Sequence, residues 1–166
     1  MKYLVCTVAV GALLAASTLS AKQIGSFKDW SAHAEGKGKA RTCWISSEPV
    51  KDEGKYKRRG RIYALVTHMP GDKVTNQVQF TAGYTFKKGS AVRVAIGKRT
   101  FQLFTNADTA WAENKEDDAA LVRAMRAGSR MIVTGTSSRG TKTKDTYSLS
   151  GISAAHKAIG KACKVK

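Results

Sequence analysis

The sequence has few acidic residues, few cysteines and few histidines, and each shortage excludes a class of site. It contains 12 Asp and Glu against 29 Lys and Arg, with three Cys and three His among 166 residues. His33, His68 and His156 are isolated, and none has a second His or a Cys at metal-ligand spacing. The acidic group at 116–118 is interpreted as a helix start rather than as a general acid–base pair. We therefore predict no metal and no other cofactor.

Catalytic motifs are missing as well. No CxxC pair supports thiol–disulfide exchange. The segment Gly135–Gly140 resembles a nucleophile elbow, but Arg139 stands where that motif needs a glycine. We predict that the protein is not an enzyme. The alternative is a hydrolase with an unrecognised site, which a cleft containing His33, His68 and an acidic residue would support.

No hydrophobic run is long enough to span a membrane. The apolar stretch Leu4–Leu14 is 11 residues long, whereas a membrane span needs about 20. It follows Lys2 and precedes small residues that end at Ala21, the layout of a secretory signal peptide. We predict a cleaved signal peptide at 1–21 and one domain at 22–166. The mature protein is then exported to the periplasm, the outer membrane or the medium, and no transmembrane segment remains.

Export changes how the cysteines are interpreted. Cleavage removes Cys6 and leaves Cys43 and Cys163. Two cysteines in an oxidising compartment pair more often than they stay free, so we predict a disulfide between them. The alternatives are two buried thiols or an intermolecular bridge. A loop of roughly 120 residues gives a chain-entropy stabilisation of about 4–5 kcal/mol as an upper figure.

The hydrophobic pattern predicts a mainly β fold. Short alternating segments are separated by turn residues, and Gly97-Lys98 suits a type II′ hairpin turn. The two alternating sets within Arg61–His68 are both apolar, which predicts a central strand covered on both faces. Pro49–Gly60 is interpreted as a charged turn region. The predicted strands are Phe27–Ala34, Arg41–Ser46, Arg61–His68, Asn76–Tyr84, Ala91–Ile96, Arg99–Phe104, Ala107–Trp111, Met131–Thr136 and Thr143–Leu149.

Two segments have helical rather than strand periodicity. Glu116–Ala127 has acids at its start, basic residues near its end and Gly128 as a stop. Ser153–Cys163 carries alanines and Ile159 at helical spacing. Eight or nine strands and two short helices favour a β-sandwich with helical additions.

The strongest remaining signal is positive charge. After cleavage, 28 basic and 12 acidic residues leave a net charge of +16. Such a field attracts phosphate and acidic glycans. Only Tyr56 lies inside a basic run, so the stacking aromatics of a nucleic-acid module are absent, and export also argues against a nucleic-acid partner. We expect anionic components of the cell envelope or host surface instead, such as lipopolysaccharide or glycosaminoglycan.

One basic run is the candidate anion-binding site. It consists of Lys55, Lys57, Arg58, Arg59 and Arg61. The alternative is a solvated loop ahead of a strand, where charge would also discourage edge-to-edge association. Either interpretation predicts that replacing Lys55, Lys57, Arg58 and Arg59 with Ser leaves folding intact.

Several short motifs occur in an order that is characteristic of one family. They are Phe27-x-x-Trp30, Cys43-x-Ile45, Ser47-x-Pro49, Ala64-Leu65-Val66-Thr67-His68-x-Pro70, Asn76-x-Val78, Ala82-Gly83-Tyr84-x-Phe86-Lys87-Lys88-Gly89-Ser90, Leu103-Phe104-Thr105, Asp108-Thr109-Ala110-Trp111-Ala112, Ala119-x-Leu121-Val122-x-Ala124-Met125-Arg126-x-Gly128-Ser129, Gly135-Thr136-Ser137-x-Arg139-Gly140-Thr141 and Asp145-Thr146-Tyr147-Ser148-Leu149-x-Gly151. In this order they resemble the invasion-associated locus B family of exported bacterial proteins.

The resemblance runs from about residue 24 to residue 163. It implies an Ig-like β-sandwich that is exported to the periplasm or the outer surface. It also implies a part in host-cell invasion or virulence, and it supplies no catalytic residues.

Overall fold

The computed structural model describes residues 21–165. The predicted signal peptide at 1–21 lies, except for Ala21, outside the described residues and stays a prediction. In the described part no helix is long and apolar enough to cross a membrane.

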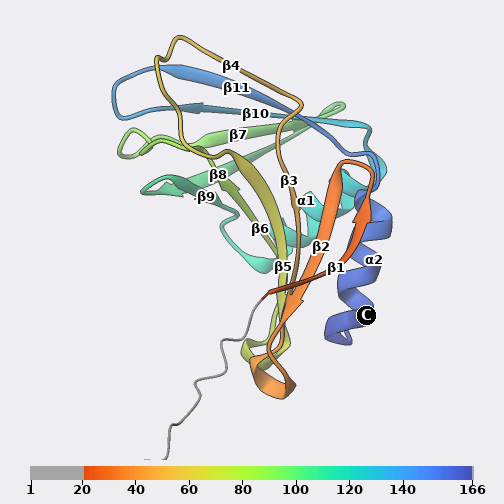
Figure 1. Cartoon of the computed structure of the whole chain (residues 1–166). Helices are drawn as coiled ribbons and strands as arrows, with labels where there is room; N and C mark the ends of the chain where they lie inside the picture. The colour runs from red at the N-terminus through yellow and green to blue at the C-terminus, as the bar shows by residue number, and fades with distance from the viewer. Residues whose placement is uncertain (1–20, 166) are drawn as a thin grey trace, which may run out of the picture.

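Residues 21–165 form one antiparallel sheet of eleven strands with two α-helices (Figure 1). The helices are α1 (Lys115–Ala127) and α2 (Ile152–Cys163), and two 3₁₀ turns are η1 (Gly38–Ala40) and η2 (Pro70–Asp72). The strands are β1 (Lys22–Phe27), β2 (Trp30–Glu35), β3 (Thr42–Ser47), β4 (Lys51–Gly54), β5 (Tyr63–Met69), β6 (Val74–Thr81), β7 (Val92–Ile96), β8 (Arg99–Asn106), β9 (Thr109–Trp111), β10 (Arg130–Thr136) and β11 (Lys142–Ser148). The mainly β class with two helices is confirmed.

The sheet has two arms that meet at β8. Its strand order is β1-β2-β3-β5-β6-β9-β8-β7-β10-β11-β4. The residues of β8 up to Leu103 pair with β7, and those from Phe104 onward pair with β9. We call β1, β2, β3, β5, β6 and β9 the first arm, and β7, β10, β11 and β4 the second arm. Because the arms share β8, the strands form one continuous sheet, and the Ig-like sandwich stays an expectation from the resemblance.

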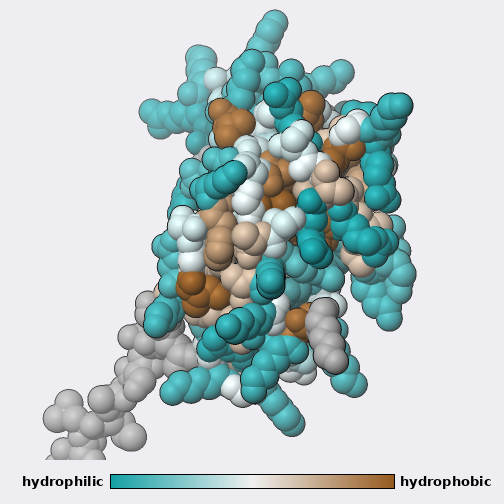
Figure 2. Space-filling model, turned by 90° about the vertical axis from the view of Figure 1, so that its right-hand side faces the viewer, coloured by the Kyte–Doolittle hydropathy of each residue, from teal (hydrophilic) through white to brown (hydrophobic). Residues whose placement is uncertain are grey.

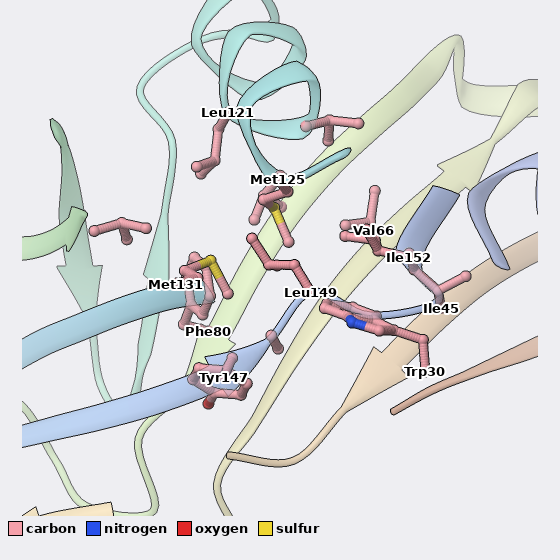
Figure 3. Packing of buried hydrophobic residues seen from close by; sticks show 14 of the residues in the cluster. Trp30, Ile45, Val66, Phe80, Leu121, Met125, Met131, Tyr147, Leu149 and Ile152 are labelled. Carbon is pink, nitrogen blue, oxygen red and sulfur yellow. The ribbon is translucent and has the colours of Figure 1, made fainter. Parts of the chain in front are cut away.

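The core lies between the inner faces of the two arms and beneath both helices. Phe80 of β6 and Tyr147 of β11 approach edge to face, with ring centroids 6.1 Å apart. The buried Trp30 of β2 donates its indole N–H to the Ser148 carbonyl of β11 at 3.0 Å. Figure 3 shows Trp30, Ile45, Val66 and Ile152 on one side of this core, and Phe80, Met131 and Tyr147 on another. The alternation of strand residues therefore provides one buried face per strand, and the bend of the sheet brings those faces together.

The prediction that the strand at 61–68 is covered on both faces is wrong. Ala64, Val66 and His68 of β5 are fully buried, whereas Tyr63 and Leu65 face outward and are only partly buried. The helices and the second arm all contribute to the core on the inner side of the first arm. The outward side chains of β5 consequently stay accessible.

Most local predictions hold, and two strands were missed. The β7–β8 hairpin turns at Gly97-Lys98, where Gly97 adopts φ +56° as the first residue of such a turn requires. The segment predicted as one strand at 27–34 contains a turn at Lys28, with φ +53°, which separates β1 from β2. The region predicted as a charged turn contains β4, which pairs with β11. Its charged residues suit an edge strand of only four residues.

Helix α1 begins and ends as its charge pattern predicts. Asn114 caps it, because the side-chain oxygen accepts the Asp117 amide at 2.9 Å. Three acids occupy the first turn and Arg126 the last, in the favourable direction of the helix dipole. The amide of Gly128 closes the helix on the Ala124 carbonyl.

The predicted disulfide is confirmed. Cys43 of β3 and Cys163 at the end of α2 are bonded across a sequence separation of 120. The bridge fastens α2 to the first arm, where α2 packs on β2 and β3.

Loss of this disulfide should lower stability without changing the fold. We expect the Cys43→Ala/Cys163→Ala variant to lose about 2–5 kcal/mol of unfolding free energy, since the unfolded chain regains the freedom that the bridge removes. Urea unfolding followed by circular dichroism measures the loss. The reduced wild type is the control and should show the same decrease; an unchanged midpoint in both would contradict the prediction.

Candidate functional site

The basic run at 55–61 lies in the loop that crosses from β4 in the second arm to β5 in the first arm. Lys55, Lys57, Arg58 and Arg61 are exposed there. Arg61 pairs with Glu48 at 3.1 Å, and both of these side chains are largely in solvent. These four side chains are therefore exposed to solvent, and their role in anion binding stays a prediction.

Arg59 points inward instead. Its two terminal guanidinium nitrogens each donate to one carboxylate oxygen of Asp145 at 2.6 Å. Its Nε–H donates to the Ala82 carbonyl at 2.7 Å. The side chains of Arg59 and Asp145 are only 3% and 5% exposed. Two tyrosine rings flank the guanidinium, with the Tyr84 centroid at 5.0 Å and the Tyr56 centroid at 5.5 Å.

The contacts between Arg59 and Asp145 favour the charged form of both side chains. Burial disfavours the charged guanidinium, but the hydrogen bonds and charge of Asp145 outweigh it, so the pKa of Arg59 is raised. Burial also raises the pKa of Asp145, while Arg59 acts in the opposite direction. The two-point contact at 2.6 Å is the geometry of an ionised carboxylate with a guanidinium, so we assign an ion pair.

Arg59 is thus removed from the predicted anion-binding set. Each of its three guanidinium nitrogens already donates one hydrogen bond within the protein, and its side chain is buried, so it has no surface to offer an external anion. The expectation that all four basic residues of the loop can be replaced by Ser without effect on folding is corrected for the same reason. Asp145, 86 residues away, was not recognised as the partner, because the motif that contains it gave no sign of burial.

The crossover loop is held at a second point beside Arg59. The Gly60 amide donates to the Gly83 carbonyl at 2.8 Å. Gly83 has φ +70°, and a Cβ there would lie 2.5 Å from the Gly60 carbonyl oxygen. The two loops approach so closely that only glycine fits at position 83.

A second basic surface lies on the outer face of the second arm, where Arg93 meets Lys142 and Lys144. Register places Arg93 of β7 beside Thr134 of β10, and Thr134 beside Lys144 of β11. Lys142 lies two residues from Lys144 and is also exposed. A groove of about 460 Å³ runs between Arg93, Lys142 and Lys144 and has Thr134 and Thr136 in its floor. We call it the basic groove.

One acid belongs to the basic groove. Glu53 of β4 pairs with Lys144 at 2.9 Å and with Lys51 at 3.0 Å. Hydrogen bonds from Lys144 and then from Lys51 lower the pKa of Glu53. The carboxylate is shared between two lysines, so the groove keeps a net positive charge. Elsewhere on the surface, Figure 2 shows long hydrophilic side chains around a less polar area.

The three histidines do not form one site. His33 lies on the outer face of β2, stacked on Trp44 with ring centroids 5.4 Å apart. His68 is fully buried on the inner face of β5. Within residues 21–165 no group of three or more His, Cys, Asp or Glu could hold a metal ion. The combination of His33 and His68 that would have supported a hydrolase is therefore not present.

The buried His68 and the partly buried His156 form a pair beside the disulfide. Their rings meet edge to face at 5.3 Å. Nδ1 of His68 accepts the Asn76 amide at 3.0 Å, and Nε2 of His156 lies 2.7 Å from the Asn76 side-chain oxygen. Burial, followed by the charges of His68 and Arg126, lowers the pKa of His156 to about 4. Burial also lowers the pKa of His68. Both rings are neutral at neutral pH and serve to hold the backbone at Asn76, which has φ +60°.

Asp118 has a shifted pKa and a structural role. It lies in the first turn of α1, is 9% exposed and accepts the Val78 amide of β6 at 2.8 Å. Strand β9 pairs with β6 only at 79–81, so Asp118 supplies an acceptor just beyond the end of that pairing. Burial raises the pKa of Asp118 to about 6, against the opposing hydrogen bond from Val78. The charge of the neighbouring Asp117 raises this pKa further. The hydrogen bond from Val78 ties α1 to β6, so Asp118 fastens the helix to the sheet.

Comparison with known protein families gives a match over most of the described chain. The sequence model of the "Invasion associated locus B (IalB) protein" family matches residues 30–160. The chain belongs to this family. No curated protein and no solved structure matches it.

The IalB match covers most of the features described above. It includes β2 through most of α2, with Arg59, Asp145 and the basic groove. It ends three residues before Cys163, whereas Cys43 lies within it. The family resemblance stated from the motifs is therefore confirmed over nearly the whole described domain.

Arg59 and its neighbour Arg58 provide a matched test of the buried pair. We expect Arg59→Ala to lose about 3–5 kcal/mol of unfolding free energy, because it leaves a buried carboxylate unpaired. Arg58→Ala, at an exposed position in the same loop, should stay within about 0.5 kcal/mol of wild type. Urea unfolding measures both. Arg59→Met with Asp145→Leu should recover much of the loss, and equal stability of the two single variants would contradict the assignment.

Asp118 should make stability depend on pH in a defined direction. Its folded pKa of about 6 lies above the unfolded value of 3.8, so the folded state binds the proton more tightly. Its contribution is complete below pH 4 and is lost as the pH rises to 6, by up to roughly 3 kcal/mol. Asp118→Asn, which keeps an acceptor for Val78, should gain stability relative to wild type over this range. Thermal unfolding at pH 4 and pH 7.5 checks this, and a pH-independent difference would count against it.

Proposed function

We propose that this IalB-family protein is an exported, non-enzymatic protein that binds anionic groups of the cell envelope or of a host surface through the basic groove. The observation that carries the proposal is the gathering of Arg93, Lys142 and Lys144 around one groove on the second arm. The binding role in host-cell invasion or virulence that the family resemblance implies forms part of the same proposal.

The spacing of the cations suits a polymer of anions. Arg93 and Lys144 lie on strands that flank β10, so they are separated by two strand spacings, about 10 Å. Cations at that distance contact successive phosphate or sulfate groups rather than one chelated ion. Threonine hydroxyls between them add neutral donors. Lipopolysaccharide and glycosaminoglycan both present anions repeatedly along one molecule.

The loop at 55–61 extends this surface. Gly54, the last residue of β4, pairs with Thr143 of β11, so the chain enters the loop beside Lys142. Lys55, Lys57 and Arg58 follow as exposed cations. Arg61 is also exposed, although it is paired with Glu48. These four residues of the predicted site remain candidates as a secondary contact.

Export is supported by the disulfide, which is stable in an oxidising compartment and rare in the cytosol. A non-enzymatic role is supported by the contacts of the groups whose pKa values are shifted. The groups with shifted pKa values make internal packing contacts and do not line a shared cleft; they are Arg59, Asp145, Asp118 and the His68–His156 pair.

Heparin and lipopolysaccharide affinity columns test the basic groove. We expect wild type to elute above 150 mM salt, and Arg93→Ser/Lys142→Ser/Lys144→Ser to elute well below it, because grouped charges resist screening better than isolated ones. The control variant is Arg123→Ser/Lys157→Ser/Lys161→Ser, which removes the same charge from exposed positions on α1 and α2. Equal elution of the two variants would show that net charge alone binds the column and would overturn the proposal.

The loop is tested separately from the groove. Lys55→Ser/Lys57→Ser/Arg58→Ser retains Arg59 and should therefore fold normally. A partial decrease in retention fits the secondary contact, and unchanged retention would restrict binding to the groove.

A further inference from the structure

The outer face of the first arm differs from the rest of this basic protein because its strand positions carry no lysine or arginine. Strand register aligns one row of side chains across seven strands, from β1 to β8. A second row runs beside it across β2, β3, β5 and β6. The first row is Ser26, Ser31, Ser46, Leu65, Gln79, Trp111 and Phe104, and the second is His33, Trp44, Thr67 and Gln77.

Most side chains on this face carry a hydroxyl, an amide or an aromatic ring. Its side chains are partly exposed, with Phe104 at 46%. Such a face offers neutral donors and acceptors beside apolar rings. In a chain with 29 Lys and Arg, a face whose strand positions carry no basic residue is poorly suited to a polyanion.

Trp44 is held in a fixed position on this face. His33 stacks on its ring with an interplanar angle of 14° and a centroid distance of 5.4 Å. The Nε2 of His33 lies 3.5 Å from the Ser46 hydroxyl. Burial lowers the pKa of His33, so the imidazole is neutral at neutral pH. A ring supported in this way loses little freedom when it stacks against a ligand.

A groove of about 510 Å³ opens beside Trp44. Trp44, Tyr63 and Leu65 form its apolar wall, and Ser31 and Ser46 contribute hydroxyls. Four charged residues, two acidic and two basic, also line it: Lys28, Asp29, Glu48 and Arg61. Their charges balance, and Arg61 and Glu48 already pair with each other. We call it the aromatic groove.

We propose that the aromatic groove binds a neutral saccharide, with a sugar ring stacked on Trp44 or Tyr63. A pyranose ring has an apolar C–H face that suits an aromatic wall. Its edge carries hydroxyl groups, which need the paired donors and acceptors that Ser46, Glu48 and Arg61 supply. The volume lies within the usual range for small-molecule sites, roughly 300–1,000 Å³. This site lies on the other arm from the basic groove and does not depend on the function proposed for it.

The charge balance decides between ligand classes. A polyanion would meet the carboxylates of Asp29 and Glu48, and an organic cation would meet Lys28 and Arg61. An uncharged polyhydroxylated ligand is repelled by neither pair of charges, and its hydroxyl groups can form hydrogen bonds with both the acidic and the basic side chains. A saccharide is the class of ligand that combines this property with an apolar ring face.

Titration of the mature, disulfide-bonded protein with neutral oligosaccharides tests the proposal. The probes are hexasaccharides of N-acetylglucosamine, glucose and mannose, followed by amide NMR shifts. We expect at least one to shift residues of β2, β3 and the start of β5, and Trp44→Ala to weaken that binding at least tenfold. Trp111→Ala removes an indole from the same face outside the groove, so it should change affinity less than twofold.

Further variants separate a lost site from a lost fold. Tyr63→Ser should weaken binding with thermal unfolding close to wild type, and Trp44→Phe should retain part of the affinity because it keeps a ring. The Arg93→Ser/Lys142→Ser/Lys144→Ser variant should bind the saccharide as wild type does, whatever its behaviour on heparin. Absence of shifts with all three probes at millimolar concentration would overturn the proposal. So would a concentration-dependent dimer that Trp44→Ala abolishes, because the face would then belong to a second copy of the chain.

Discussion

The buried ion pair between Arg59 and Asp145 holds the crossover between the two arms of the sheet. The chain leaves the first arm after β3, forms the edge strand β4 in the second arm and returns through the loop at 55–62 to begin β5. Arg59 ties this loop to the inner face of β11 and to the carbonyl of Ala82. Tyr84, whose ring lies against the guanidinium, also contacts the Thr143 hydroxyl at 2.6 Å. One side chain thus connects β11 with the loops that precede β5 and follow β6.

This cluster also explains why a charge is buried in a protein with a large excess of cations. Burial between two rings removes water from the guanidinium, and the two-point contact with Asp145, the bond to Ala82 and the faces of the rings offset that cost. A lysine would reach the same carboxylate as a point charge without the second bond. The disulfide performs a related task at the other end of the molecule, where it fastens α2 to β3.

The bend at β8 divides the outer surface into two chemically different faces. The second arm presents Arg93, Lys142 and Lys144 in one groove, and the first arm presents Trp44, Tyr63 and Leu65 in another. Both faces consist of the outward half of alternating strands, so the same backbone pattern supports both.

The sequence by itself determined most of the elements and the buried face of most strands, because alternation with period two and helical periodicity are local properties. It predicted α1, the hairpin at Gly97 and, because cleavage of the predicted signal peptide would leave two cysteines, the bond between Cys43 and Cys163. Only the tertiary structure decided which cation is buried, because Arg59 finds its partner 86 residues along the chain. It also placed His33 and His68 on opposite faces and left the outer face of β5 uncovered. Strand order and partner choice depend on long-range packing, which no local pattern in this chain encodes.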